Sequence, residues 1–336
     1  MRSVLRKRLM FVTGTRYQVQ MPEFVAIVMQ SLQLGITGPK VSAHCLGTMY
    51  FGTAPHAAAL LTRFRDAGGT FLDTANVYAG WVQDGRAGDS EGRVGSWLAE
   101  NQERDNVVLA TKVGFGCKPS ADTPGIPQGL RPEWIRAQCE ASLKRLRTSH
   151  IDLYYAHLDD REVPIAEWLG ALQQLRSEGK ILHLGISNFA AWRLALVADR
   201  AGEALCAHQS KYTYLRPVRG RSYHPWPPAN EEHDDAESAI GVTRVAYSPL
   251  LKGAYQRPDR AIPKPYKTPE NQGRLTVLAK IAKAHGVTPG QVVLAWLQQR
   301  PAPVIPLYSA STVEQLDENL AAADLRLSDE DLAQLS

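Results

Sequence analysis

Four residues of this chain have side chains that could together move a proton to or from an oxygen atom. Asp73 directly follows a short apolar run, and Tyr78 lies five residues beyond it. Lys112 and His157 each directly follow another such run. A tyrosine hydroxyl has an ordinary pKa near ~10, and a neighbouring ammonium lowers that pKa by stabilising the phenolate. A carboxylate holds the ammonium in place, and a histidine can hydrogen-bond a carbonyl oxygen, so the four suit donation of a proton to a carbonyl group.

Eight short apolar runs predict the strands that must position these side chains. Several are continuous rather than alternating, as in parallel strands buried on both faces. Helical stretches separate them, at 57–66, 132–146, 164–177, 274–285 and 289–299. The repeated order of strand and helix predicts a single (β/α)8 TIM barrel, with the strands at Val41–Leu46, Thr70–Leu72, Val107–Thr111, Ile151–Ala156, Ile181–Ile186, Leu205–His208, Thr243–Ala246 and Val304–Leu307.

An open, doubly wound sheet is the alternative fold. That fold would place a Gly-x-Gly-x-x-Gly segment after the first strand, and Gly47-Thr48-Met49-Tyr50 does not match it. In a barrel, functional groups gather at the carboxyl ends of the strands. Each predicted strand is followed there by a polar residue: Thr48, Asp73, Lys112, His157, Ser187-Asn188, Gln209, Tyr247-Ser248 and Ser309.

Any one of these polar residues has an ordinary structural explanation. A single aspartate after a strand is commonly a helix cap, and a single histidine is commonly a hydrogen-bonded structural residue. Eight at one rim favour a functional site. They include neither an activated serine or cysteine nucleophile nor a cluster of metal ligands, so we expect no metal.

Several segments, in order along roughly nine-tenths of the chain, resemble the aldo-keto reductases. The similar segments are Phe71-Leu72-Asp73-Thr74-Ala75 with Tyr78, Ala110-Thr111-Lys112-Val113, Asp152-Leu153-Tyr154-Tyr155-Ala156-His157, Gly185-Ile186-Ser187-Asn188-Phe189, Ala246-Tyr247-Ser248-Pro249-Leu250 and Val313-Glu314-Gln315-Leu316-Asp317-Glu318-Asn319-Leu320. The resemblance implies reduction of an aldehyde or ketone by hydride from NAD(P)H. Tyr78 would then protonate the carbonyl oxygen, Lys112 would lower its pKa, and Asp73 would pair with Lys112. His157 would hydrogen-bond the carbonyl.

The resemblance also implies a cofactor site along the same rim. Ser187, Asn188 and Gln209 match positions that hold the nicotinamide carboxamide, and Tyr247 matches the ring that stacks on nicotinamide. The remaining expected cofactor contacts are Thr48 and Asp73 at the rim, Ser248 and Leu250 along the pyrophosphate, Ser309 and Ser311 near the 2′-phosphate, and Gln315 and Asn319 at the adenosine end.

One cofactor segment departs from the family pattern. Many relatives carry a cation in the stretch that reads Leu307-Tyr308-Ser309-Ala310-Ser311-Thr312 here, where it meets the 2′-phosphate of NADP. Ser309 and Ser311 can hydrogen-bond a phosphate but lack the charge-assisted strength of arginine. NADP(H) is therefore the expected cofactor by resemblance, and NAD(H) stays open.

For the substrate, Tyr50, Trp81 and Phe115 are candidate walls, together with Met49. Asp159, Lys211 and Tyr212 add hydrogen-bonding capacity. This mixed lining suits a sugar-like carbonyl, which we favour, as well as an aromatic aldehyde. A further segment, Arg216–Glu237, is rich in proline and aromatic residues, and so long a loop in a compact domain is usually functional or mobile.

The bulk composition excludes other classes of protein. Hydrophobic residues make up 44% and charged residues 21% of the 336, which is typical of a globular chain and not of a disordered one. The net charge of +4 includes five cations in residues 1–20, which hold no acid, so the other 316 residues carry about −1. Binding to nucleic acid is therefore not expected. No apolar run is long enough to span a membrane.

The four cysteines lie far apart and form no Cys-x-x-Cys pair, which favours a reducing cytoplasm. Residues 1–28 lack the features of a signal peptide, and we expect them to lie outside the fold, with residues 29–336 forming the barrel domain. A small-molecule carbonyl compound is the expected partner, and the oligomeric state is open.

Two other functions remain possible for such a barrel. Relatives of this fold serve as nucleotide-sensing regulatory subunits of membrane channels, with little turnover. A barrel aldolase or isomerase would instead use Lys112 as a Schiff-base nucleophile, and it would need neither Tyr78 nor the Ser187-Asn188 pair.

Overall fold

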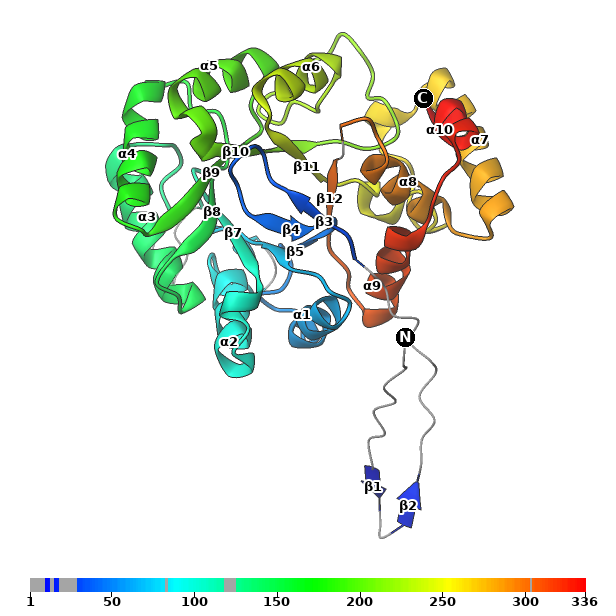
Figure 1. The fold of residues 1–336 in the computed structure, drawn as a ribbon, viewed down its shortest axis with the longest axis horizontal. Coiled ribbons are helices and arrows are strands. Elements are labelled where there is room, and N and C mark those ends of the chain that lie inside the picture. Colours follow the sequence, from blue (N-terminus) through cyan, green and yellow to red (C-terminus); the bar gives the residue numbers. More distant parts are fainter. Residues whose placement is uncertain (1–9, 13–14, 18–28, 82–83, 118–124, 303) are drawn as a thin grey trace.

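Eight parallel strands close into a barrel in the computed structural model of the chain, which describes residues 10–12, 15–17, 29–81, 84–117, 125–302 and 304–336. The helices surround it (Figure 1), so the expected (β/α)8 barrel is confirmed. In barrel order the strands are β5 (Cys45–Gly47), β6 (Phe71–Asp73), β7 (Val108–Val113), β8 (Ile151–Ala156), β9 (Ile181–Ser187), β10 (Leu205–Lys211), β11 (Thr243–Tyr247) and β12 (Ile305–Tyr308).

The strand register brings the polar strand ends to one rim. Asp73 pairs with Ala110 across β6 and β7, and Lys112 is two residues further along β7. Gln209 on β10 pairs with Ser187 on β9. Because side chains alternate between the two faces of a strand, residues two apart on one strand share the interior face. Below the polar rim the interior is packed with apolar side chains, namely Leu34, Val41, Cys45, Phe71, Ala110, Leu153, Tyr155, Cys206, Ala207, Val245 and Ile305.

A second apolar layer lies between the barrel and its helices. The helix α8, for example, has a capping box in which Thr288 and Gln291 each bond the other's backbone, and its residues Val292–Leu297 are buried. The helices are α1 (Ala57–Asp66), α2 (Asp89–Asn101), α3 (Pro132–Leu146), α4 (Ile165–Ser177), α5 (Ala191–Ala201), α6 (Glu231–Ile240), α7 (Pro269–His285), α8 (Pro289–Gln298), α9 (Val313–Leu320) and α10 (Asp329–Leu335).

A hairpin closes the amino-terminal end of the barrel, and it corrects one expectation. The run Val41–Leu46 is not one strand: it is shared between β4 (Lys40–Ser42) and β5, with β4 pairing antiparallel to β3 (Ser31–Gln33). Figure 1 shows this hairpin lying across the barrel. The main-chain N–H of Gly35, in the hairpin turn, donates to the hydroxyl of Thr243 at the start of β11. Gly35 has φ +56°, and a Cβ there would meet the backbone of Cys206 at 2.7 Å. The spacing of apolar residues could not predict this turn, because the turn depends on contacts with residues far away in the sequence.

Most other strands and helices begin or end one to five residues from the expected positions, for example β10, which runs to Lys211 and not to His208. Two of these differences have a local cause. The helix α7 begins at Pro269, five residues before the expected start, because Thr268 caps it by accepting from the N–H of Asn271. The loop expected over Arg216–Glu237 ends at Asn230, which caps α6 with a capping box. The acidic residues in the first turn of α6 interact favourably with the positive end of the helix dipole. The helix therefore forms although turn-forming residues precede it.

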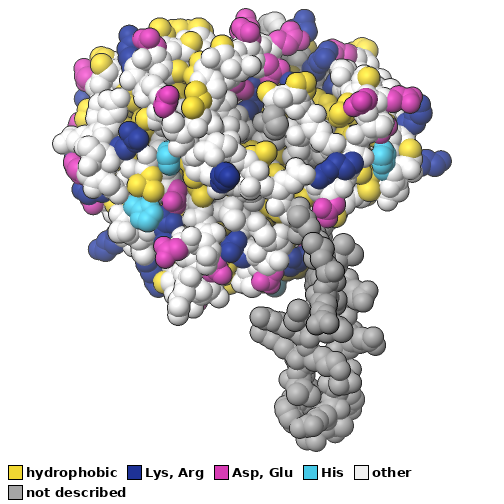
Figure 2. Space-filling model, in the orientation of Figure 1, with side chains coloured by type: hydrophobic (Ala, Val, Ile, Leu, Met, Phe, Trp, Pro, Cys, Tyr) yellow, Lys and Arg dark blue, Asp and Glu magenta, His cyan; other side chains and the backbone are white. Residues whose placement is uncertain are grey.

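The N-terminal segment contains β1 (Met10–Val12) and β2 (Thr15–Tyr17), which pair antiparallel. The expected division between residues 1–28 and 29–336 stays a prediction. No helix of the described part is long and apolar enough to cross a membrane. The cysteines are free, and the cytoplasmic location stays a prediction. On the face shown in Figure 2, cations and carboxylates are interspersed, without a stripe of one sign.

Candidate active site

The ammonium of Lys112 is the centre of the site. Its Nζ donates to Asp73 Oδ1 at 2.5 Å, to the carbonyl of Thr74 at 2.7 Å and to the hydroxyl of Tyr78 at 3.0 Å. Lys112 and Asp73 have no exposed side-chain surface. Three acceptors thus satisfy the three hydrogens of the ammonium, which fixes its position beside the tyrosine oxygen.

The Asp73 carboxylate is itself held from two sides. Its Oδ2 accepts from Nε2 of Gln209 at 2.8 Å, so β10 and β7 both orient it. The hydroxyl of Thr48 donates to the main-chain carbonyl of Asp73 at 3.0 Å and also contacts the hydroxyl of Ser90. The expected proximity of Asp73, Lys112 and Gln209 is therefore observed.

The electrostatics of Tyr78 differ in one respect from the expectation. Burial raises the pKa of Tyr78 above its usual value, and the positive charge of Lys112 only partly opposes this rise. Burial alone would lower the pKa of Lys112, but Asp73 and Tyr78 outweigh it and the pKa of Lys112 is raised. At neutral pH the site therefore holds a protonated tyrosine against a charged ammonium, which is the state a proton donor needs.

The ring of His157 packs beside that of Tyr78. Its ring centroid is 5.9 Å from that of Tyr78, and its main-chain N–H donates to the carbonyl of Val113. Burial, followed by the charge of Lys112, keeps the pKa of His157 well below its usual value. Nδ1 of this buried ring has no hydrogen-bond partner among the described residues. A neutral imidazole carries one N–H, which is available to a carbonyl oxygen bound beside Tyr78.

The residues expected to hold nicotinamide form one connected group. Nδ2 of Asn188 donates to the carbonyl of His157 at 2.9 Å and to Oγ of Ser187 at 3.0 Å. The hydroxyl of Tyr247 donates to Asn188 Oδ1 at 2.8 Å, which fixes the orientation of its ring. Asn188 has φ +65°, a left-handed conformation that asparagine tolerates better than most residues.

These residues fit a nicotinamide by the chemistry of their polar atoms. The hydroxyl of Ser187 accepts from Asn188 and keeps its own hydrogen to donate to a carboxamide oxygen. Gln209 gives its N–H to Asp73, and its amide oxygen can accept from a carboxamide N–H. Tyr247 offers a flat ring beside them. A nicotinamide cofactor therefore fits the donor set.

The expected pyrophosphate and adenosine contacts lie on two segments after β11 and β12. Ser248 has φ +55° and begins a tight loop that contains Leu250. Ser309 is half-buried beyond β12, and the N–H of Ser311 donates to Oε1 of Gln315. Asn319 is buried one turn further along α9. Their contacts with a cofactor stay predictions.

Three aromatic side chains, Trp81, Phe115 and Trp226, form an aromatic rim beside Tyr78 and His157. The ring of Phe115 packs edge-on against His157 at 4.5 Å between centroids and stacks with Trp226 at 6.2 Å and 15°. The ring of Trp81 is 5.9 Å from that of Tyr78. Trp81 and Trp226 are 54% and 49% exposed, which is unusual for the largest apolar side chains.

For the other expected wall residues, no contact with these rings is observed in the described part of the chain. Tyr50 is exposed on the loop after β5. The carboxylate of Asp159 makes ion pairs with Arg193 at 2.7 Å and with Arg161 at 3.1 Å, so its charge is already compensated. Roles of Tyr50 and Asp159 toward a substrate stay predictions.

Sequence reasoning missed two participants. Trp226 belongs to the proline-rich loop that begins at Arg216. Its contact with Phe115 joins residues over a hundred positions apart, so it could be known only from the fold. The carbonyl of Thr74, which accepts from Lys112, is a main-chain group and has no side-chain signature. The sequence signal for Trp226 was the occurrence of a tryptophan among prolines in a long loop.

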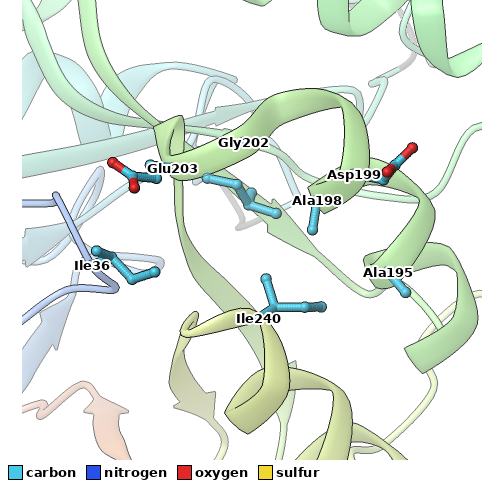
Figure 3. Close-up of a pocket in the computed structure, with 8 residues that line it drawn as sticks. Ile36, Ala195, Ala198, Asp199, Gly202, Glu203 and Ile240 are labelled. Atoms are coloured by element: carbon cyan, nitrogen blue, oxygen red, sulfur yellow. The ribbon is translucent and has the colours of Figure 1, made fainter.

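A hollow at the opposite end of the barrel lacks this chemistry. It lies between the β3–β4 hairpin, α5 and the last turn of α6, and has a volume of about 400 Å³ (Figure 3). Its polar side chains are two carboxylates, Asp199 and Glu203, and the rest of its lining is Ile36, Ala195, Ala198, Gly202, Leu205 and Ile240.

The geometry bears on the other chemistries considered for a barrel. Groups of three or more potential metal ligands are absent among the described residues. A Schiff-base lysine must lose its proton, whereas the buried pairing with Asp73 keeps Lys112 charged. A barrel with a protonated tyrosine, an ammonium and a neutral imidazole at its carboxyl rim belongs to the class of oxidoreductases that act on carbonyl groups.

Comparison with known proteins places the chain within that class. Residues 44–336 match the Aldo/keto reductase family. The chain is 34% identical over 324 residues to the uncharacterized oxidoreductase YrpG of Bacillus subtilis (strain 168), covering 92% of this chain and 95% of that protein. The chain therefore belongs to the aldo-keto reductase family and is an NAD(P)H-dependent enzyme that reduces carbonyl groups.

Two further relatives carry more specific names. The aldo-keto reductase yakc of Schizosaccharomyces pombe (strain 972 / ATCC 24843), whose name specifies NADP(+), is 31% identical over 317 residues, with 87% of this chain and 86% of that protein covered. The aryl-alcohol dehydrogenase GME11368 of Pestalotiopsis microspora is 30% identical over 320 residues, with 88% and 78% covered.

Proposed function

We propose that this enzyme reduces the carbonyl group of an aromatic aldehyde or ketone to an alcohol, with Tyr78 as the proton donor. The bound nicotinamide cofactor supplies the hydride. The observation that carries the proposal is the contact of Lys112 Nζ with the hydroxyl oxygen of Tyr78 at 3.0 Å. Because the tyrosine oxygen accepts from Lys112, its own hydrogen is free to be donated to a carbonyl oxygen.

The chain's own residues then divide the work of proton transfer. As Tyr78 gives up its proton, negative charge develops on its oxygen, and the fixed ammonium of Lys112 stabilises that charge. Asp73 keeps the ammonium in place and prevents its displacement by substrate. The neutral ring of His157 donates to the carbonyl oxygen and so fixes which face of the carbonyl is presented.

The aromatic rim supports an aromatic substrate. Flat rings at Trp81, Phe115 and Trp226 offer stacking and edge contacts to another flat ring. The name of the aryl-alcohol dehydrogenase relative agrees with this choice. The sugar-like substrate expected from sequence stays a prediction, and it is tested by the same panel of compounds.

Tyr78→Phe tests the mechanism. We expect loss of carbonyl reduction by at least a hundredfold with cofactor binding retained, because general acid catalysis contributes roughly 10²–10⁴-fold. Tyr214→Phe is the matched control, since its hydroxyl bonds the carbonyl of Arg274 away from the site. Wild-type turnover by Tyr78→Phe would contradict the mechanism. If the wild type and the variant both show almost no turnover but bind the cofactor tightly, the nucleotide-sensing alternative is favoured.

Two experiments identify the preferred cofactor and the substrate class. NADP(H) is the family expectation, and with serines at 309 and 311 we propose that NADH binds as well, within about tenfold of NADPH. Quenching of tryptophan fluorescence measures both affinities. A panel of benzaldehydes, aryl ketones and ketosugars then decides the substrate class, and a preference for ketosugars would refute the aromatic assignment.

A further inference from the structure

A buried serine at the start of α2 is joined to the Lys112 ammonium through a single residue. Ser90 has no exposed surface, and neither have Thr48 and Thr74, which directly follow β5 and β6. The Ser90 hydroxyl oxygen lies 2.7 Å from the carbonyl oxygen of Thr48 and 3.1 Å from the hydroxyl oxygen of Thr74. A helix outside the barrel is thereby bound to the ends of two neighbouring strands.

The directions of these hydrogen bonds follow from the hydrogens available. A serine hydroxyl has one hydrogen, and a carbonyl oxygen only accepts. Ser90 donates its hydrogen to the Thr48 carbonyl, so the hydrogen in the contact with Thr74 comes from the Thr74 hydroxyl. Without the Ser90 oxygen, the buried Thr74 hydroxyl would lose this acceptor, which is unfavourable for a group shielded from water.

Thr74 is the residue through which Ser90 reaches the ammonium. The carbonyl oxygen of Thr74 accepts from Lys112 Nζ at 2.7 Å. The N–H of Thr74 donates to the carbonyl of Ala110 on β7 at 2.9 Å. Its hydroxyl is held by Ser90. Thr74 is therefore fixed at its N–H and at its side chain, and its carbonyl is a fixed acceptor for Lys112.

The start of α2 also holds the other end of the loop that carries Tyr78. The N–H of Gly88, the residue before α2, donates to the carbonyl of Tyr78 at 3.3 Å. Ser90 contacts Thr74, where this loop begins. The loop from Thr74 to Tyr78 is thus bound at both ends to the same helix start.

A second side chain of the same turn binds α2 to the strand of the lysine. Glu91 is buried, and its carboxylate accepts from the hydroxyl of Thr111 at 2.6 Å. Thr111 directly precedes Lys112 on β7. The other carboxylate oxygen accepts from Arg145 on α3 at 2.7 Å, which compensates the charge. One helix turn is therefore bound to both segments that set the distance between Lys112 and Tyr78.

We propose that Ser90 is a positioning residue for proton transfer, which holds Thr74 so that the Lys112 ammonium stays beside the Tyr78 oxygen. The inference rests on the proposed function, because it requires Tyr78 to exchange a proton. Without the Ser90 hydroxyl, the Thr74 carbonyl is less fixed, and the ammonium follows it away from the 3.0 Å contact with Tyr78. The phenolate that forms in either direction of the reaction is then less stabilised.

The pH dependence of the reverse reaction separates positioning from packing. Oxidation of an alcohol requires a deprotonated Tyr78, so its rate rises with pH through the pKa of Tyr78. Burial raises this pKa and the charge of Lys112 opposes the rise, so displacement of the ammonium raises it further. The titratable groups around Tyr78 are Lys112 on β7, Asp73 on β6, Cys45 on β5, His157 after β8 and Tyr247 on β11.

The test compares Ser90→Ala with Ser42→Ala. Ser42 is also buried, and its hydroxyl accepts from the N–H groups of Thr70 and Phe71 at the amino-terminal end of the barrel. We expect Ser90→Ala to lower kcat about tenfold and to raise the midpoint of benzyl alcohol oxidation with NADP⁺ by about one pH unit, since one unit of pKa corresponds to a factor of ten. NADPH affinity, measured by fluorescence quenching, should not change. Ser42→Ala should lower the urea midpoint and leave the pH midpoint unchanged.

Thr74→Val removes the same contact from its other side, and it replaces Ser90→Ala in the test if that variant does not fold. The effects of the two substitutions on kcat should not add, because each breaks the same hydrogen bond. Additive effects would overturn the proposal, and so would an unchanged pH midpoint in whichever variant folds.

Two other outcomes are assigned in advance. A loss of NADPH affinity with an unchanged pH midpoint would mean that Ser90 acts through Thr48 on the cofactor, which also overturns the proposal. Retention of turnover by Tyr78→Phe would instead overturn the proposed function, so the two failures are distinguishable.

Discussion

Lys112→Met should destabilise the folded protein by about 3–5 kcal/mol. Lys112 and Asp73 are wholly buried, with 2.5 Å between the ammonium and the carboxylate. After the substitution, the side-chain donor left to the Asp73 carboxylate among the described residues is the amide of Gln209 at 2.8 Å. Removing one partner of a buried ion pair costs about 3–5 kcal/mol because the other charge stays desolvated without compensation.

The double variant Asp73→Asn/Lys112→Met distinguishes this reasoning from simple loss of packing. With both charges gone, no unpaired charge is buried, so the double variant should lose about 3 kcal/mol less than the sum of the single variants. The free energy of unfolding is measured by urea denaturation, with tryptophan fluorescence as the signal. Additive single effects would refute the reasoning. Arg136→Gln, which breaks an exposed pair with Glu178, is the control and should leave the urea midpoint unchanged.

Three further predictions concern turnover and affinity. Because burial keeps the pKa of Tyr78 above its usual value of 10, the tyrosine stays protonated, and carbonyl reduction should be constant from about pH 6 to 9 and fall only above about pH 10; a fall between pH 6 and 8 would contradict this. Trp226→Ala should raise KM for aryl aldehydes about tenfold with little change in kcat, whereas Trp192→Ala should change neither in steady-state kinetics. Ser311→Arg should improve NADPH affinity about tenfold in a fluorescence titration and leave NADH unchanged, and an equal gain for both would place residue 311 away from the 2′-phosphate.

The barrel and its polar rim could be predicted because both depend on local pattern. The run Ile151–Ala156 is apolar apart from Asp152, and the strand β8 has those same bounds. Strand ends of a parallel barrel meet at one rim, so Asp73, Lys112 and Gln209 could be brought together before any coordinates. Their contacts confirm that inference.

The remaining features depend on contacts between distant segments. The β3–β4 hairpin is short, and its turn is shaped by Gly35 against Cys206, which lies over 170 residues away. The raised pKa of Tyr78 reflects burial, which sequence spacing does not report. The stack of Phe115 on Trp226 joins two loops that are over a hundred residues apart in the sequence.

The hairpin at the amino-terminal end of the barrel determines where substrate enters and product leaves. Since it seals the base of the barrel, every compound that reaches Tyr78 must enter and leave through the opposite mouth. The half-exposed rings of Trp81 and Trp226 lie at that end, near Tyr78 and Phe115, so bulkier or smaller side chains there would change the rate of entry and release without altering any group that performs the chemistry. Entry and release therefore depend on side chains that take no part in the proton transfer.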